Sequence, residues 1–128
     1  RSIHRHQWEL DKVDAALDDT EAHHARGFGE LSRRIQIRRN QGAFHPNATQ
    51  YTLHFGRAVF AFWRESLDRR QSVFALHNVS AEPQKIPLVE LNLIATESWR
   101  DLLSDKSLPD LDSELVLEPY QAVWITNT

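Results

Sequence analysis

The sequence predicts an α+β fragment, in which an N-terminal helical arm is followed by an antiparallel β-sandwich or Greek-key unit. Two observations support this class. Apolar residues recur every three or four positions up to about residue 40, and they alternate with polar residues from Gln50 onward, between frequent turns. Between these regions Pro46 lacks an amide hydrogen and disfavours helix at His45. The predicted segments are a helical part at 1–42, a junction at 43–49 and an all-β domain at 50–128.

Two helices are predicted in the arm. The first covers Trp8 to Leu17, and the polar stretch from Asp18 to Thr20 ends it. The second covers Glu21 to about Asn40 and carries a stripe of apolar residues at helical spacing, namely Phe28, Leu31 and Ile35. One long helix cannot bury such a stripe by itself, so we expect another part of the protein to cover it.

Short strands and turns are expected in the rest of the chain. Gly56 and Arg57 fit a two-residue type II′ turn between the first two strands, and the first three strands read as an antiparallel meander. Pro87 indicates an edge strand, and the last two strands are expected to pair with each other across Pro119. The predicted strands are Tyr51–Phe55, Ala58–Trp63, Ser72–Asn78, Gln84–Leu88, Leu91–Ala95, Trp99–Leu103, Leu115–Leu117 and Tyr120–Ile125.

The composition excludes several classes of protein. The 128 residues carry 15 basic and 18 acidic side chains and a net charge of −3, so no field that attracts nucleic acid arises. Cysteine is absent, which rules out disulfides and thiolate chemistry. No apolar run approaches the roughly 20 residues that span a bilayer. We expect a cytoplasmic protein, and the lack of any methionine indicates a processed or excised segment.

The polar residues do not form a recognisable catalytic group. His4 and His6 form an H-x-H pair, and His23 and His24 point about 100° apart on a helix, so neither pair predicts a metal site. The carboxylate pairs lie in polar, turn-like sequence that would not raise a pKa, and they are Asp18 with Asp19, Asp110 with Asp112, and Glu114 with Glu118. We expect no catalytic residue, no metal and no cofactor in this chain.

Aromatic residues have two possible roles. On strands they could form a platform on which sugars stack, or they could fill the sandwich core. Trp63 and Trp124 lie in segments that are apolar on both faces, which favours the core. The aromatic set comprises Trp8, Trp63, Trp99 and Trp124, with Phe60, Phe62, Phe74 and Tyr120.

Four stretches carry a family resemblance that covers nearly the whole chain. They are Arg1–His6, then Leu31–Gln50 with its Ala-Phe-His-Pro sequence, then Leu76–Ser80, and finally Trp99–Ser104 followed by Leu117–Tyr120 and Trp124. Their order resembles the C-terminal end of sucrose-phosphorylase-like enzymes of the α-amylase superfamily, glycoside hydrolase family 13. His4 stands where these relatives usually have Asn.

The resemblance implies that the arm is the last helical region of a (β/α)8 barrel and that the β unit is the domain packed beside it. Such enzymes are retaining and transfer a glucosyl unit, and their catalytic carboxylates lie on barrel strands that this chain does not contain. The one implied substrate-binding residue is Arg1, near the active-site mouth. The implied partners are the missing barrel and the sugar substrate of the parent enzyme, without nucleic acid or membrane.

Three functions follow as hypotheses. The first is structural support of the barrel by a non-catalytic C-terminal region, in an enzyme that is either a phosphorylase or a hydrolase. The second is an independent carbohydrate-binding module that uses exposed tryptophans. The third is a protein-interaction domain whose helical arm docks on a partner, and the arm could also mediate self-association.

Overall fold

A computed structural model describes residues 7–91, 93–94, 97–108 and 110–128. The chain divides into two compact units, 1–36 and 37–128. The division lies within the second helix, so the last turn of that helix belongs to the β unit. The predicted segment limits at 42 and 49 stay predictions.

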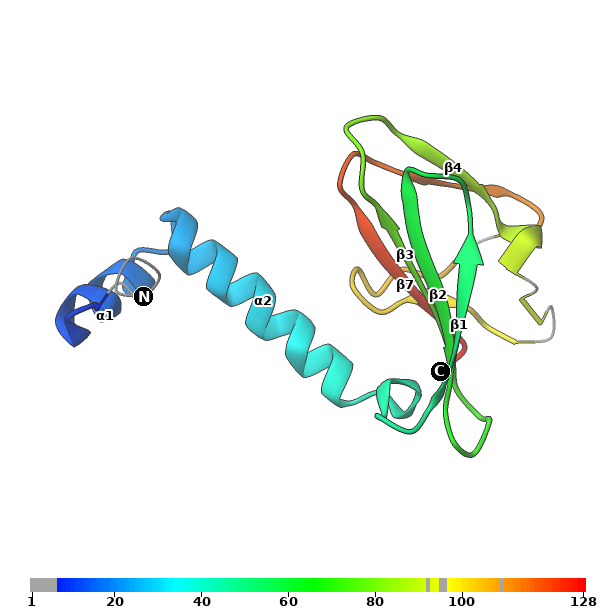
Figure 1. Ribbon diagram of the computed structural model, residues 1–128, viewed down its shortest axis with the longest axis horizontal. Helices are drawn as coiled ribbons and strands as arrows, with labels where there is room; N and C mark the ends of the chain where they lie inside the picture. Colours follow the sequence, from blue (N-terminus) through cyan, green and yellow to red (C-terminus); the bar gives the residue numbers. More distant parts are fainter. Residues whose placement is uncertain (1–6, 92, 95–96, 109) are drawn as a thin grey trace. The chain divides into compact units, whose positions relative to one another are not determined.

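The first unit contains two helices, α1 (Leu10–Asp18) and most of α2 (His23–Arg39), as Figure 1 shows. Both predicted helices are thereby confirmed. Asp19 lies in the break between them, where its carboxylate accepts a hydrogen bond from the Glu21 amide over 3.1 Å. Neither helix contains a buried residue.

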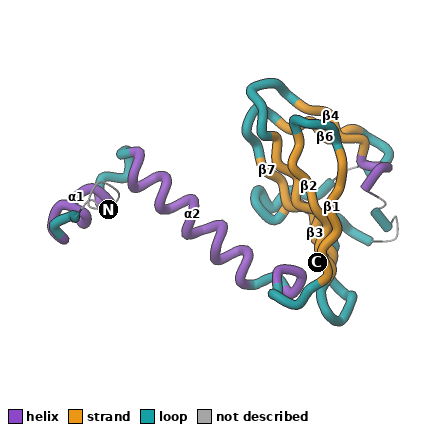
Figure 2. Tube along the Cα trace, viewed as in Figure 1, coloured by secondary structure: helices purple, strands orange, loops and turns teal. Residues whose placement is uncertain are grey.

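The second unit is built from two antiparallel sheets (Figure 2). One sheet has five strands in the order β1-β2-β3-β7-β5, and the other pairs β4 with β6. The strands are β1 (Thr49–His54), β2 (Val59–Glu65), β3 (Ser72–Asn78), β4 (Gln84–Pro87), β5 (Arg100–Asp101), β6 (Glu114–Leu117) and β7 (Ala122–Thr126). The predicted α+β class, with a meander of three strands, is confirmed.

A hydrophobic core lies between the two sheets. Ala61 and Leu76 from the large sheet and Ile86 and Leu117 from the small sheet belong to one cluster, and each is at most 1% exposed. Alternation explains this arrangement, because every second residue of β2 and β3 points to the same face. A second, smaller cluster of Ala43, Phe44, Val73 and Leu102 lies on the opposite face of the large sheet.

Three details differ from the sequence prediction. The first loop comprises residues 55–58 rather than two residues. Phe55 lies in this loop and packs against the core, and Gly56 has the expected positive φ of 77°. The last two strands do not pair with each other. β6 pairs with β4 and β7 pairs with β3 and β5, since the chain changes sheets at residues 118–121, where Tyr120 has a φ of 59°.

The third difference lies in the segment after β4. Residues Leu88–Leu91 form a 3₁₀ helix, η3, in place of the start of the strand predicted at Leu91–Ala95. Part of that predicted strand lies outside the described residues. The helix α2 ends at Arg39, and a further 3₁₀ helix, η2 (Gly42–Phe44), leads into β1.

Candidate functional site

The described residues that the sequence singled out for chemistry do not converge. Arg1, His4 and His6 lie outside the described residues. Among the described residues, no three histidine or carboxylate side chains gather closely enough to hold a metal ion.

One carboxylate of each of the three predicted pairs has a local structural contact. Asp110 accepts from the Asp112 amide over 2.9 Å, which closes a turn, and Glu114 forms an ion pair with Lys85 over 3.2 Å. The Asp19 carboxylate accepts the hydrogen bond from the Glu21 amide that was described above. The contacts of Asp19 and Asp110 agree with the expectation of solvated turn residues, whereas Glu114 begins strand β6.

Two carboxyl groups have shifted pKa values, and both shifts are downward. The hydrogen bond from Arg33 is the main cause that lowers the pKa of Glu30, and the hydrogen bond from the Ser66 hydroxyl is the main cause that lowers the pKa of Asp68. A general acid needs the opposite shift, because it must hold its proton near neutral pH. Glu30 and Asp68 therefore have structural rather than acid–base roles.

The aromatic residues divide between core and surface. Trp99 and Phe74 are buried in the sandwich, as predicted for core residues, whereas Trp8, Phe60 and Tyr120 are exposed. Trp63 lies between two rings, with Tyr51 stacked at 4.7 Å on one strand and Phe74 at 5.6 Å on the other. Because the ring of Trp63 already stacks on two neighbours, it does not offer the open platform that stacking on a sugar requires.

The outer face of the large sheet carries a second aromatic group, formed by Phe60, Phe62, His77 and Trp124. Trp124 donates from Nε1 to Nε2 of His77 over 3.3 Å, and Nδ1 of His77 lies 3.2 Å from the carbonyl oxygen of Phe60. These contacts assign the proton of the neutral ring to Nδ1. His77 also stacks on Phe62, and Phe60 remains 56% exposed beside them. The sheet thus presents an apolar, ordered face.

The junction before β1 covers part of that face. Phe44 packs on Trp124 with ring centroids 5.1 Å apart, and the guanidinium of Arg64 on β2 holds the junction backbone. Arg64 donates to the carbonyl oxygens of Ala43 and His45, each over 2.8 Å, and to that of Ala48 over 3.3 Å. Sequence reasoning did not find Arg64, since its partners lie about 20 positions away and are backbone atoms.

A pocket of about 420 Å³ opens at the inner face of the large sheet, near the turn between β2 and β3. Its apolar part is lined by Leu53, Phe74, Leu91 and Trp99. Its polar rim carries Glu65, Arg69, Glu90, Glu97, Ser72 and Asn127. The residues come from four separate parts of the β unit, which is why no sequence motif predicted this pocket.

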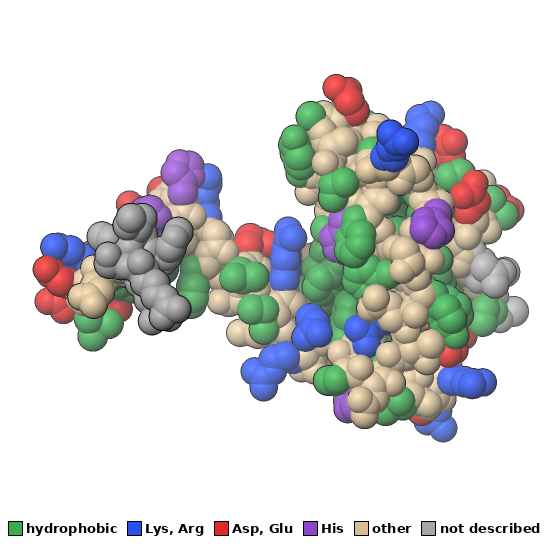
Figure 3. All heavy atoms as spheres, in the orientation of Figure 1, with side chains coloured by type: hydrophobic (Ala, Val, Ile, Leu, Met, Phe, Trp, Pro, Cys, Tyr) green, Lys and Arg blue, Asp and Glu red, His purple; other side chains and the backbone are tan. Residues whose placement is uncertain are grey.

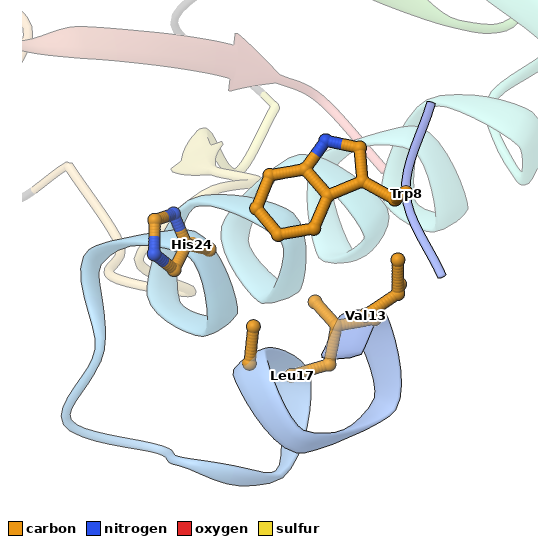
Figure 4. Close-up of a pocket in the computed structure, with 5 residues that line it drawn as sticks. Trp8, Val13, Leu17 and His24 are labelled. Carbon is orange, nitrogen blue, oxygen red and sulfur yellow. The ribbon is translucent and has the colours of Figure 1, made fainter. Parts of the chain in front are cut away.

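A smaller pocket of about 240 Å³ lies in the helical unit, where Trp8, Val13, Leu17 and His24 face one another across α1 and the start of α2 (Figure 4). Its lining is almost entirely apolar. No chemistry follows from it, because His24 is the one ionisable side chain among its lining residues.

Comparison with known proteins gives one sequence relative and several similar folds. The chain is 28% identical over 125 residues to the glucosylglycerate phosphorylase of Escherichia coli (strain K12), which covers 98% of the chain and 21% of that protein. The chain thus spans about a fifth of the length of this relative. No protein-family model matches.

Two of the similar folds are crystal structures of AmyP. In complex with maltotriose, AmyP matches 76% of the chain and 19% of its own chain with a TM-score of 0.61 at 14% identity. In complex with maltose the TM-score is 0.60 over 75% of the chain and 19% of AmyP, again at 14% identity. At these identities the match concerns the fold alone. Together with the phosphorylase match, it confirms the predicted resemblance to part of a glycoside hydrolase- or phosphorylase-like enzyme.

Within the described ranges, neither helix combines the length and the apolar composition that crossing a bilayer requires.

Proposed function

We propose that this chain is the non-catalytic C-terminal region of a retaining α-glucosyl-transferring enzyme, of sucrose-phosphorylase-like type, and that it supports a catalytic (β/α)8 barrel. The observation that carries the proposal is the exposed stripe on α2. Phe28 and Leu31 are each 59% exposed, and Ile35 is 48% exposed, although they occupy one face of the helix at regular spacing. Burying such a face normally stabilises a helix, so we infer that this face of α2 packs on the barrel in the whole enzyme.

The outer face of the large sheet supports the same proposal. Phe60, Phe62 and Trp124 form an apolar surface that the junction covers only in part. Figure 3 shows hydrophobic side chains exposed on both the helical unit and the β unit. An apolar sheet face of this kind is typical of an interdomain contact.

The roles of the remaining parts follow from this proposal. The glucosyl donor and acceptor would bind in the barrel, with Arg1 near the mouth of the active site, and the β unit would contribute no catalytic group. The relative's activity toward glucosylglycerate makes phosphorolysis the favoured reaction of the whole enzyme. A cytoplasmic location without nucleic-acid or membrane partners remains part of the proposal.

Two experiments test it. The reading frame upstream of Arg1 is expected to encode barrel strands with three catalytic carboxylates, and their absence would refute the proposal. In the full-length enzyme, Leu31→Asp is expected to lower the midpoint of thermal unfolding, because a charge would enter the helix–barrel contact. Arg26→Asp introduces the same side chain at an exposed site of the same helix and is expected to leave the midpoint nearly unchanged. Equal effects of the two variants would contradict the contact.

A further inference from the structure

The strand β1 lies at the edge of the five-stranded sheet and pairs with β2 on one side (Figure 1). All six of its residues keep one register with β2, from Thr49 opposite Glu65 to His54 opposite Phe60, so no bulge interrupts the strand. Among the described residues, no backbone hydrogen bond joins its other side to a neighbouring segment. The alternate amide and carbonyl groups along that side are therefore available for pairing with a further strand.

The other edge strands of the β unit carry features that hinder such pairing. β4 contains Lys85 and Pro87, and β6 begins with Glu114. β5 has two residues, of which Arg100 also forms a bridge with Ser107. By contrast, β1 contains no proline and no Lys, Arg, Asp or Glu residue, and five of its six residues are exposed. Charge, proline and short length keep edge strands apart, so β1 is the strand of the described residues that is best suited to accept another.

The two faces of β1 set the pattern that an added strand must match. Tyr51 and Leu53 point inward, where Tyr51 stacks on Trp63 at 4.7 Å and Leu53 packs against the core. The outward side chains are polar, namely those of Gln50, Thr52 and His54. An added strand must therefore continue the sheet with apolar side chains inward and polar side chains outward.

A second copy of β1 has this pattern. A two-fold axis perpendicular to the sheet makes the two strands antiparallel and keeps inward side chains beside inward ones. An axis at Thr52 places this residue opposite Thr52 of the other copy, and threonine pairs of this kind stabilise antiparallel strands. The same register places Tyr51 opposite Leu53 inside and Gln50 opposite His54 outside, with no like charges facing each other.

We propose that β1 pairs with β1 of a second copy of this chain in this register, so that two five-stranded sheets join into one. Strand addition of this type derives its affinity from main-chain hydrogen bonds and its specificity from the alternating side chains. Every residue that it uses belongs to the unit 37–128, so the inference does not rest on the proposed support of a barrel.

The test is amide hydrogen exchange of the 128-residue chain at two protein concentrations, because this measurement reports on β1 alone. We expect the alternate amides of β1 that do not bond to β2 to exchange about fourfold more slowly at about 1 mM than at about 10 µM. A dissociation constant of about 100 µM would leave roughly a fifth of the chains monomeric at the higher concentration. Equal exchange at both concentrations would assign this edge to a different strand and overturn the proposal.

Charge variants at the two-fold axis test the register. Thr52→Lys and Thr52→Glu, each alone, are expected to reduce the slowing to about twofold or less, because like charges directly opposite each other destabilise strand pairing. An equimolar mixture of the two variants places opposite charges at the axis and should restore the slowing, which also shows that both variants fold. Thr20→Lys makes the same change at an exposed position outside β1 and is the matched control, with wild-type behaviour expected. Undiminished slowing in the single variants, or no recovery in the mixture, would overturn the proposal.

Discussion

The side-chain amide of Asn78 donates a hydrogen bond to the carbonyl oxygen of Leu117 over 3.2 Å, which ties β3 of the large sheet to β6 of the small sheet. The same nitrogen lies 2.9 Å from the carbonyl oxygen of Glu118 and 2.8 Å from that of Glu82. Its carbonyl oxygen accepts from the Ser80 amide over 2.9 Å. Asn78 is 3% exposed, so this one side chain satisfies several backbone groups that water scarcely reaches.

Replacing the Asn78 amide by a carboxylate is therefore expected to be costly. Asn78→Asp would aim a negative oxygen at three carbonyl oxygens and is expected to lower the free energy of unfolding by about 3 kcal/mol. Urea unfolding at neutral pH measures this. Asn47→Asp makes the same change at an exposed site and is expected to cost less than about 0.5 kcal/mol. Similar costs at both sites would show that the Asn78 contacts contribute little.

The junction before β1 depends on Arg64 in the same way. Arg64→Met would keep the aliphatic length but remove the donors to Ala43, His45 and Ala48, at an expected cost of about 2–3 kcal/mol. Amide hydrogen exchange should show lost protection at Phe44 and Ala48, whose amides are bonded within the junction. Arg57→Met, at an exposed loop position, is the control. Unchanged exchange at the junction in Arg64→Met would contradict the role given to this guanidinium.

The turn between β2 and β3 makes stability depend on pH through Asp68. Its carboxylate accepts from the Ser66 hydroxyl over 2.7 Å and from the Arg70 amide over 3.2 Å, which lowers its pKa below the ordinary value of 3.8. A lowered pKa in the folded state adds stability above the unfolded pKa, and this stability is lost as pH falls through the folded pKa.

Asp68→Ala is thus expected to lower the midpoint of thermal unfolding at neutral pH, and the difference from wild type should shrink below about pH 4. Asp68→Asn keeps an acceptor oxygen that does not titrate. The difference in the midpoint of thermal unfolding between this variant and wild type should therefore vanish or change sign at acid pH. The carboxyl carbon signal of Asp68 measures the pKa directly by NMR. A midpoint at or above 3.8 would refute the proposed effect of Ser66 and Arg70.

The sequence predicted what depends on local pattern. The spacing of Phe28, Leu31 and Ile35 predicted α2, and the apolar runs at β2 and β3 predicted strands in the middle of the sheet. The contacts of Asn78 could not be read in this way, because Leu117 lies 39 positions away and accepts through its backbone. The pairing of the last strands was wrong for a related reason, since local pattern identifies a strand but not its neighbour in the sheet.

The candidate pocket shows the same limit. Glu65, Arg69 and Glu90 are unremarkable surface residues in the sequence, and Glu97 lies in a loop between two short elements. Only the fold brings them around one space, with Trp99 and Phe74 below. Only the aromatic residues stood out in the sequence, and the sequence favoured a core position for the whole aromatic set. The structure places Trp99 and Phe74 in the core, whereas Phe60 is exposed.

The exposed stripe of α2 predicts how the isolated chain behaves in solution. Phe28, Leu31 and Ile35 are 48–59% exposed, and a second copy of the chain can cover them when no barrel is present. We expect sedimentation to show self-association of the chain at concentrations of about 100 µM. Leu31→Asp should shift the population toward monomer, because charge in an apolar contact carries a desolvation cost. Arg26→Asp, on the same helix, should not. A wild type that is monomeric at that concentration, or an equal shift in both variants, would show that the stripe does not drive association.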